Sequence, residues 1–184
     1  MSREKKTVRE MTLIGVVLAF ICVLSSLPMG INILGVAATL QIFVIAFAGF
    51  VLGAKKGALT ATLYVIIGLI LPVYSNMTSG PGILFGPTGG FLFGFIPLAF
   101  ICGMTVKINH YLFKALLSIC GVLVCHTIGL IQFVLVTDMD MMGSILAVTL
   151  PYLPKDITMT ALAWMVARPV RRAIKYMDSS VKRS

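Results

Sequence analysis

Charge is scarce in this sequence, and acidic side chains are the scarcest part of it. Asp, Glu, Lys and Arg together make up 11% of the 184 residues, against 59% for hydrophobic types, and the acidic residues number 6. Soluble domains carry about 25% charged residues. The mean hydropathy is +1.03. The composition therefore excludes an ordinary soluble domain and predicts an integral membrane protein.

Motifs for catalysis, metal binding and energy coupling are also absent. The sequence contains no GxxxxGK[ST] phosphate loop, no His/Cys/Glu set at metal-ligand spacing and no plausible nucleophile–base pair. Its 4 cysteines form no CxxC pair and lie in apolar segments, which is typical of small buried hydrophobes. No carboxylate lies within an apolar segment to couple transport to protons or sodium. We therefore expect a binding protein that is not an enzyme, needs no cofactor and cannot power transport alone.

Apolar spans are what the chain has in abundance. Each is about as long as a helix that crosses ~30 Å of hydrocarbon at ~1.5 Å per residue. They predict an all-α integral membrane protein with six transmembrane helices in one domain over 11–176. A charged tail, 1–10, precedes this domain, and a basic tail, 177–184, follows it. The predicted spans are 11–27, 36–52, 58–71, 91–106, 112–136 and a last one from 155 to beyond 168.

The six spans sort the charges between the two sides of the membrane. All but one of the 15 Lys and Arg residues fall on one side, and the other side holds Lys155 with Asp138, Asp140 and Asp156. By the positive-inside rule both termini are cytoplasmic, in a multi-pass protein of the prokaryotic plasma membrane. The net charge of +9 is then explained by orientation and by anionic headgroups of the bilayer, without a nucleic acid.

Unusual backbone is concentrated in the three loops assigned to the outer side, 28–35, 72–90 and 137–154. Residues 80–90 hold five glycines and two prolines among eleven positions, so no regular helix is expected to run through them. Irregular backbone at membrane depth is tolerated where it lines a cavity or is buried in protein. We expect residues 80–90 to form one wall of a small-molecule site.

Polar residues near this wall are the candidate ligand contacts. Lys155 and Asp156 are the one ion pair of the outer side, at the start of the last helix, where free N–H groups favour anions such as a carboxylate. A helix cap with a snorkelling Lys is the alternative. Thr39 and Gln41, expected about a turn inside the second helix, either bind a ligand or join helices. Asn76 adds a neutral donor and acceptor in the loop.

Two further patterns concern helix contacts. His126 and Gln132 lie in the fifth span, and we expect them to make interhelical hydrogen bonds, because we expect no acidic partner for a proton relay. Gly15 and Ala19 form a small-xxx-small face on the first span, which favours close helix approach or docking of another membrane protein.

Several of these segments, taken in order, resemble the BioY family, the biotin-specific substrate-binding (S) components of energy-coupling-factor (ECF) transporters. The resemblance covers about residues 11–172. The Gly-Pro-Thr-Gly-Gly run within residues 84–92 is its most specific part. The segments that carry it are Thr39–Gln41, Gly53–Gly57, Pro72–Tyr74, Gly80–Gly82, Leu84–Leu92 and Pro154–Asp156.

The resemblance implies a six-helix protein that binds biotin in an outward-facing pocket. It also implies partners, namely a transmembrane coupling protein and two ABC-type ATPases, with Gly15 and Ala19 on the docking face. Biotin would be a ligand, not a cofactor. The pocket residues that the family motif implies are Thr39, Gln41, Asn76, the backbone of Gly89 and Gly90, and Asp156.

One position departs from the family pattern. The family usually has Lys three residues after the Asp, where this chain has Met159. Lys155 takes over the role of that Lys under one hypothesis, and the ligand is another vitamin or a biotin precursor under a second. A membrane scaffold that transports nothing is the alternative from a different class.

Overall fold

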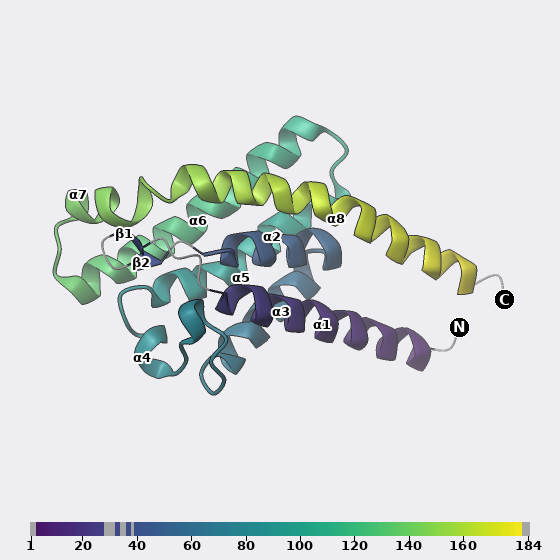
Figure 1. Cartoon of the computed structure of the whole chain (residues 1–184). Helices are drawn as coiled ribbons and strands as arrows, with labels where there is room; N and C mark the ends of the chain where they lie inside the picture. The colour runs from purple at the N-terminus through teal and green to yellow at the C-terminus, as the bar shows by residue number, and fades with distance from the viewer. Residues whose placement is uncertain (1–2, 28–31, 34–35, 38, 182–184) are drawn as a thin grey trace.

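The computed structural model of the chain describes residues 3–27, 32–33, 36–37 and 39–181, and these residues form a bundle of helices (Figure 1). Six longer helices match the six predicted spans in order. They are α1 (Arg3–Ser26), α2 (Gln41–Leu52), α3 (Ala54–Ile67), α5 (Gly89–Met104), α6 (Tyr111–Thr137) and α8 (Leu153–Val181). The shorter elements are β1 (Asn32–Ile33), β2 (Val36–Ala37), η1 (Ser75–Met77), α4 (Pro81–Leu84), η2 (Thr105–Lys107), α7 (Met141–Ser144) and the π-helical turn η3 (Ile145–Thr149).

Three of the six longer helices are both long and apolar enough to cross a membrane, judged by length and composition over the described residues. These spans are Thr7–Ser26, Gly89–Lys107 and Tyr111–Thr137. The helix α2 is apolar but has 12 residues, which corresponds to about 18 Å. The helical, apolar character is that of a membrane protein.

The predicted second span, 36–52, begins too early. Val36 and Ala37 form the strand β2, which pairs antiparallel with β1, and α2 starts at Gln41. β-branched residues such as Val36 and its partner Ile33 favour extended backbone. The pairing places Asn32 opposite Ala37 and Ile33 opposite Val36.

The centre of the bundle is α2. Ten of its residues are buried, as its continuous apolar sequence requires, because a helix that is apolar all round must be covered on all sides. Glycines let neighbouring helices approach closely. A Cβ at Gly94 of α5 would lie 2.9 Å from Cys125 of α6, and one at Gly90 would lie 2.6 Å from the carbonyl oxygen of Ile128. The small-residue spacing on α5 thus serves packing against α6.

Residues 80–90 interrupt the helical pattern, as expected. Gly80 has φ of +96°, and Pro81 begins the single turn of α4, where its missing N–H costs nothing. The side-chain amide of Gln132 on α6 donates to the carbonyl oxygens of Leu84 and Gly86, at 2.9 and 2.8 Å. Gln132 thereby joins α6 to the segment around α4, and the predicted bonding role of Gln132 is confirmed.

The two ends of the bundle differ in charge. The start of α1 and the end of α8 lie at one end, with α4 and α7 at the other (Figure 1). At the first end Lys56 pairs with Glu10 at 2.7 Å, and Arg9 donates to the carbonyl oxygen of Ile174 at 3.1 Å. Arg171 donates to the carbonyl oxygen of Phe50, at the end of α2, at 3.0 Å. Basic residues from α1, α3 and α8 therefore meet at one end.

Candidate functional site

A cavity of about 230 Å³ opens at the end of the bundle opposite these basic residues. It lies where the starts of α2, α5 and α8 approach the middle of α6 and the segment around η1. Five predicted site residues line it, as does His126, which sequence reasoning did not place in the site. The five are Thr39, Gln41, Asn76, Lys155 and Asp156.

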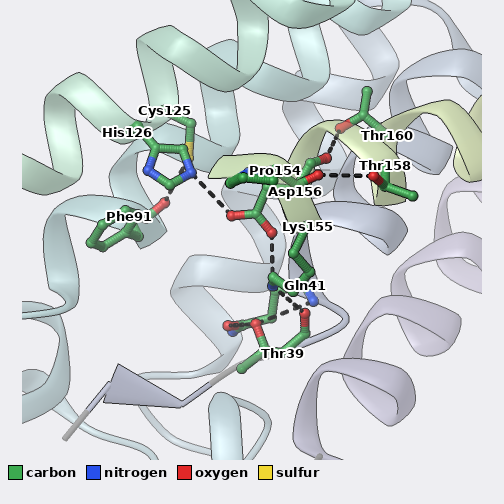
Figure 2. A network of polar contacts seen from close by, with 10 residues as sticks. All are labelled: Thr39, Gln41, Phe91, Cys125, His126, Pro154, Lys155, Asp156, Thr158 and Thr160. Atoms are coloured by element: carbon green, nitrogen blue, oxygen red, sulfur yellow. Dashed lines mark hydrogen bonds and ion pairs between the residues drawn. The ribbon is translucent and has the colours of Figure 1, made fainter. Parts of the chain in front are cut away.

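Asp156 lies at the centre of a network of polar contacts (Figure 2), and it lines this cavity. Its side chain is 6% exposed and pairs through Oδ1 with Lys155 Nζ at 2.7 Å and through Oδ2 with His126 Nε2 at 3.0 Å. Asp156 lies in the first turn of α8, where the helix dipole favours a negative charge. A buried carboxylate needs such partners, because removing an ion from water costs several kcal/mol.

Lys155 joins the start of α8 to the segment that precedes α2. Its Nζ donates to the carbonyl oxygen of Thr39 at 3.0 Å as well as pairing with Asp156, and it lies 5.8 Å from the centre of the Tyr152 ring. An ammonium has three N–H groups, so one remains for a ligand. The side chain is 24% exposed and lines the cavity.

His126 makes the interhelical hydrogen bond that the sequence predicts, from α6 to Asp156 on α8. The expectation that it has no acidic partner is wrong, because helix packing brings His126, which is 2% exposed, against the carboxylate of Asp156. An ionised carboxylate only accepts hydrogen bonds, so Nε2 carries the proton and donates. The other ring nitrogen, Nδ1, is buried and has no hydrogen-bond partner among the described residues. The ring of Phe91 packs edge-on against the imidazole at 5.5 Å between centroids.

Thr39 and Gln41 lie at the start of α2, not a turn inside it, because α2 begins at Gln41. The Thr39 hydroxyl donates to Gln41 Oε1 at 3.0 Å, and Gln41 Nε2 donates to the Tyr64 hydroxyl at 2.8 Å. Tyr64 in turn donates to the carbonyl oxygen of Val73 at 3.1 Å. This chain of bonds ties α2 to α3 and to the segment that precedes η1.

Tyr64 and Tyr74 are buried residues that sequence reasoning missed. Tyr74 lines the cavity and donates to the carbonyl oxygen of Val65 at 2.6 Å. Burial raises the pKa of the Tyr74 phenol, which keeps the hydroxyl protonated and able to donate. Tyr74 ends one of the segments that resemble the BioY family, whereas no local spacing distinguishes Tyr64.

Asn76 reaches the cavity from an unusual backbone conformation. Its φ and ψ are 55° and 35°, in the left-handed region that Asn tolerates better than most residues. Its side chain is exposed at the cavity rim.

Gly89 and Gly90 lie outside the cavity, unlike the other residues predicted to bind the substrate. Neither lines the cavity, although their neighbours Thr88 and Phe91 do. A Cβ at Gly89 would lie 2.6 Å from Gln132 Nε2, so both glycines pack against α6. Met159, one turn after Asp156, is half-buried and does not line the cavity either.

Comparison with known proteins decides the family. A family model described as the BioY family matches residues 1–176. The chain belongs to the BioY family. A BioY relative of Rhodobacter capsulatus, "Biotin transporter BioY", is 31% identical over 179 residues, which cover 88% of this chain and 93% of that protein. "Probable biotin transporter BioY" of Pyrococcus horikoshii is 32% identical over 163 residues, covering 86% of this chain and 94% of that protein.

A solved structure supports the same assignment at the level of the fold. It is the crystal structure of the S-component for biotin from an ECF-type ABC transporter. This BioY chain superposes on it with a TM-score of 0.83 at 25% identity, over 94% of this chain and 95% of that one. The family that the sequence motifs resemble is thereby confirmed.

Proposed function

We propose that this protein is the substrate-binding membrane subunit for biotin uptake, and that it captures biotin in the cavity around Asp156. The observation that carries the proposal is the buried carboxylate of Asp156, held between Lys155 and His126 in the wall of a cavity that also contains Asn76. BioY relatives named as biotin transporters and the likeness to an S-component for biotin support the choice of ligand.

The chemistry of the cavity suits the two polar ends of biotin. The third N–H of Lys155 and the free N–H groups at the start of α8 can take the valerate carboxylate by charge-assisted bonds. Asp156 and Asn76 suit the ureido group, since a carboxylate oxygen accepts from N–H and an amide both donates and accepts. Phe91, Phe95 and Leu92 supply apolar walls for the thiophane ring.

In our proposal the six longer helices span the plasma membrane as one domain over 11–176, with the cavity facing outward and both termini in the cytoplasm. The gathering of Arg9, Lys56 and Arg171 at the end opposite the cavity supports this orientation. The protein would carry no enzymatic activity and need no cofactor. ATP hydrolysis would be supplied by two ABC-type ATPases that join through a transmembrane coupling protein.

Calorimetric titration of the purified protein with biotin tests the ligand. We expect saturable binding of about one biotin per chain. No detectable heat with biotin, together with tight binding of another vitamin or of a biotin precursor, would move the proposal to that ligand. Met159 is the observation that favours this second candidate, because it replaces the Lys usual in the family.

Docking of the partner module is tested by a substitution on the face of α1 that carries Gly15 and Ala19. Both residues are exposed, and nothing lies within 4 Å of a Cβ placed at Gly15, so the face is open to a partner helix. We expect Gly15→Leu to reduce co-purification with the ATPases while biotin binding stays unchanged. Unchanged co-purification would exclude this face as the docking surface. A chain that binds no ligand and recruits no ATPases would fit a membrane scaffold.

A further inference from the structure

A second cavity, of about 240 Å³, lies at the basic end of the bundle. Five cationic side chains from α6 and α8 line it, and no carboxylate does so within the described part of the chain. The cations, which we call the basic cluster, are Lys114, Arg168, Arg171, Arg172 and Lys175. Five cations around one cavity without an acid repel one another, so an anion there lowers the energy of the whole cluster.

Two of the arginines are held in position by the protein. Arg171 Nη1 donates to the carbonyl oxygens of Phe50 and Val51, at 3.0 and 3.3 Å, where α2 ends. Arg168 lies over the Trp164 ring at 4.7 Å from its centre, and its Nη2 donates to the Tyr111 hydroxyl at 3.4 Å. Neutral partners orient both guanidinium groups without cancelling their charge. The groups are therefore preorganised for an anion with several oxygens.

An apolar groove of about 440 Å³ continues from this cavity between α6 and α8. Lys114 and Trp164 line both the cavity and the groove, so the two are contiguous. Farther along, the groove is lined by small or apolar side chains, among them Ala115, Ile119, Ile157 and Ala161. A phosphate alone would leave this groove unused, whereas an acyl chain fits its shape and polarity.

The aromatic residues at the junction have the chemistry of a membrane interface. Tyr111 and Trp164 pack edge to face at 6.0 Å between ring centroids, with Lys114 5.4 Å from the Tyr111 ring. Trp and Tyr collect at the headgroup level of membranes, and basic pockets between helices bind anionic lipid headgroups. An acidic protein segment would meet the cations but would not explain a groove that points along the helices.

We propose that this basic cavity and its groove form a binding site for an anionic phospholipid, with the phosphate on the basic cluster and an acyl chain between α6 and α8. The site is separate from the biotin cavity. Lys155 and Arg171 are 16 residues apart on α8, which corresponds to about 24 Å along the helix. The proposal therefore stands whatever ligand the first cavity binds.

Trp164 provides the measurement, because it is the single tryptophan of the chain and lines the site. The full chain is reconstituted in phosphatidylcholine vesicles that contain a minor fraction of lipid with brominated acyl chains, which quench tryptophan fluorescence on contact. We expect brominated phosphatidylglycerol to quench Trp164 more strongly than brominated phosphatidylcholine at the same mole fraction. We also expect salt to reduce the difference, because exposed charges are screened.

Removing charges inside and outside the basic cluster distinguishes binding by the cluster from attraction by the general positive charge of this end. The double variant Arg172→Gln/Lys175→Gln, at two exposed positions, is expected to weaken the apparent affinity for phosphatidylglycerol about fivefold for each cation removed. Lys55→Gln/Lys107→Gln removes two exposed bases outside the cavity and is expected to keep the preference. An unchanged thermal unfolding midpoint in detergent checks that both variants are folded.

Four results would overturn the proposal. Equal quenching by the two brominated lipids would remove the headgroup selectivity. An unchanged preference in the Arg172→Gln/Lys175→Gln variant would remove the role of the cluster. Displacement of brominated phosphatidylglycerol by inorganic phosphate alone would assign the cavity to a soluble anion, and loss of ATPase co-purification without any lipid preference would assign it to an acidic partner protein.

Discussion

The helix α8 carries charge at two places, and the two are arranged in opposite ways. Near its start, Asp156 is buried and is paired with Lys155 and His126. About four turns later, Arg168 and Arg171 rest on aromatic rings and main-chain carbonyls, and no acid lines their cavity within the described residues. The same helix therefore holds a compensated charge cluster at one end and an uncompensated one at the other.

This difference predicts how strongly substitutions at each place on α8 change ligand binding. Removing a charge from a buried, compensated cluster leaves the remaining charges without partners, which costs about 3–5 kcal/mol. Removing one from an exposed, uncompensated cluster relieves repulsion and costs little. We therefore expect substitutions at the cavity end to change ligand binding strongly, and substitutions at the basic end to leave biotin binding unaffected.

The largest effect is expected for Asp156→Asn. The substitution keeps the shape of the side chain but leaves Lys155 and His126 without a carboxylate, so we expect biotin affinity to fall by about 100-fold or more. Calorimetric titration measures the loss. Asp138→Asn is the matched control, because Asp138 is exposed and has φ of 53°, a conformation that Asn also adopts. Equal affinity in Asp156→Asn and Asp138→Asn would contradict the assigned role of Asp156.

The next largest effect is expected for Lys155→Met. This change keeps the apolar stem but removes the ion pair with Asp156 and the bond to Thr39. A hydrogen bond to a charged group contributes about 1.5–3 kcal/mol, so biotin affinity should fall about 10- to 100-fold in the same titration. Arg172→Gln at the basic end should change biotin affinity by no more than about twofold, since exposed charges contribute little. Similar losses of biotin affinity in both variants would show that the two places on α8 do not differ in their role in ligand binding.

A smaller effect, on stability, is expected where residues 80–90 pack against α6. In Gly90→Ala the new Cβ would lie 2.6 Å from the carbonyl oxygen of Ile128, and overpacking of this kind costs about 1–3 kcal/mol. We expect a lower thermal unfolding midpoint in detergent. Gly15→Ala adds the same methyl group where nothing lies within 4 Å, and it should leave the midpoint unchanged. If Gly90→Ala were as stable as Gly15→Ala, the close contact with α6 would be excluded.

The smallest effect is expected for Met159→Lys, which restores the residue usual in the family. Lys155 already pairs with Asp156, and Met159 does not line the cavity. We therefore expect biotin affinity to rise by less than about threefold, a change below 1 kcal/mol. A rise of tenfold or more in the titration would show that Lys155 does not replace the missing Lys and would favour a different natural ligand.

Most of the helical framework could be predicted because it depends on local properties of the chain. Continuous apolar runs predicted all six longer helices, and the glycines and prolines of residues 80–90 predicted the break before α5. The error at Val36 and Ala37 has a local cause too, since these two residues suit either an apolar helix or a short strand. Pairing with Asn32 and Ile33 decided for the strand.

The sequence by itself determined that this is a helical membrane protein with polar residues confined to a few positions, because composition and hydropathy are properties of the chain alone. It also placed Lys155 next to Asp156. Only the tertiary structure decided that His126, 30 residues before Asp156, bonds to the carboxylate of Asp156. It also decided that five cations of α6 and α8 surround one cavity. The physical reason is that helix packing sets contacts across long sequence separations, and no local spacing encodes which faces meet.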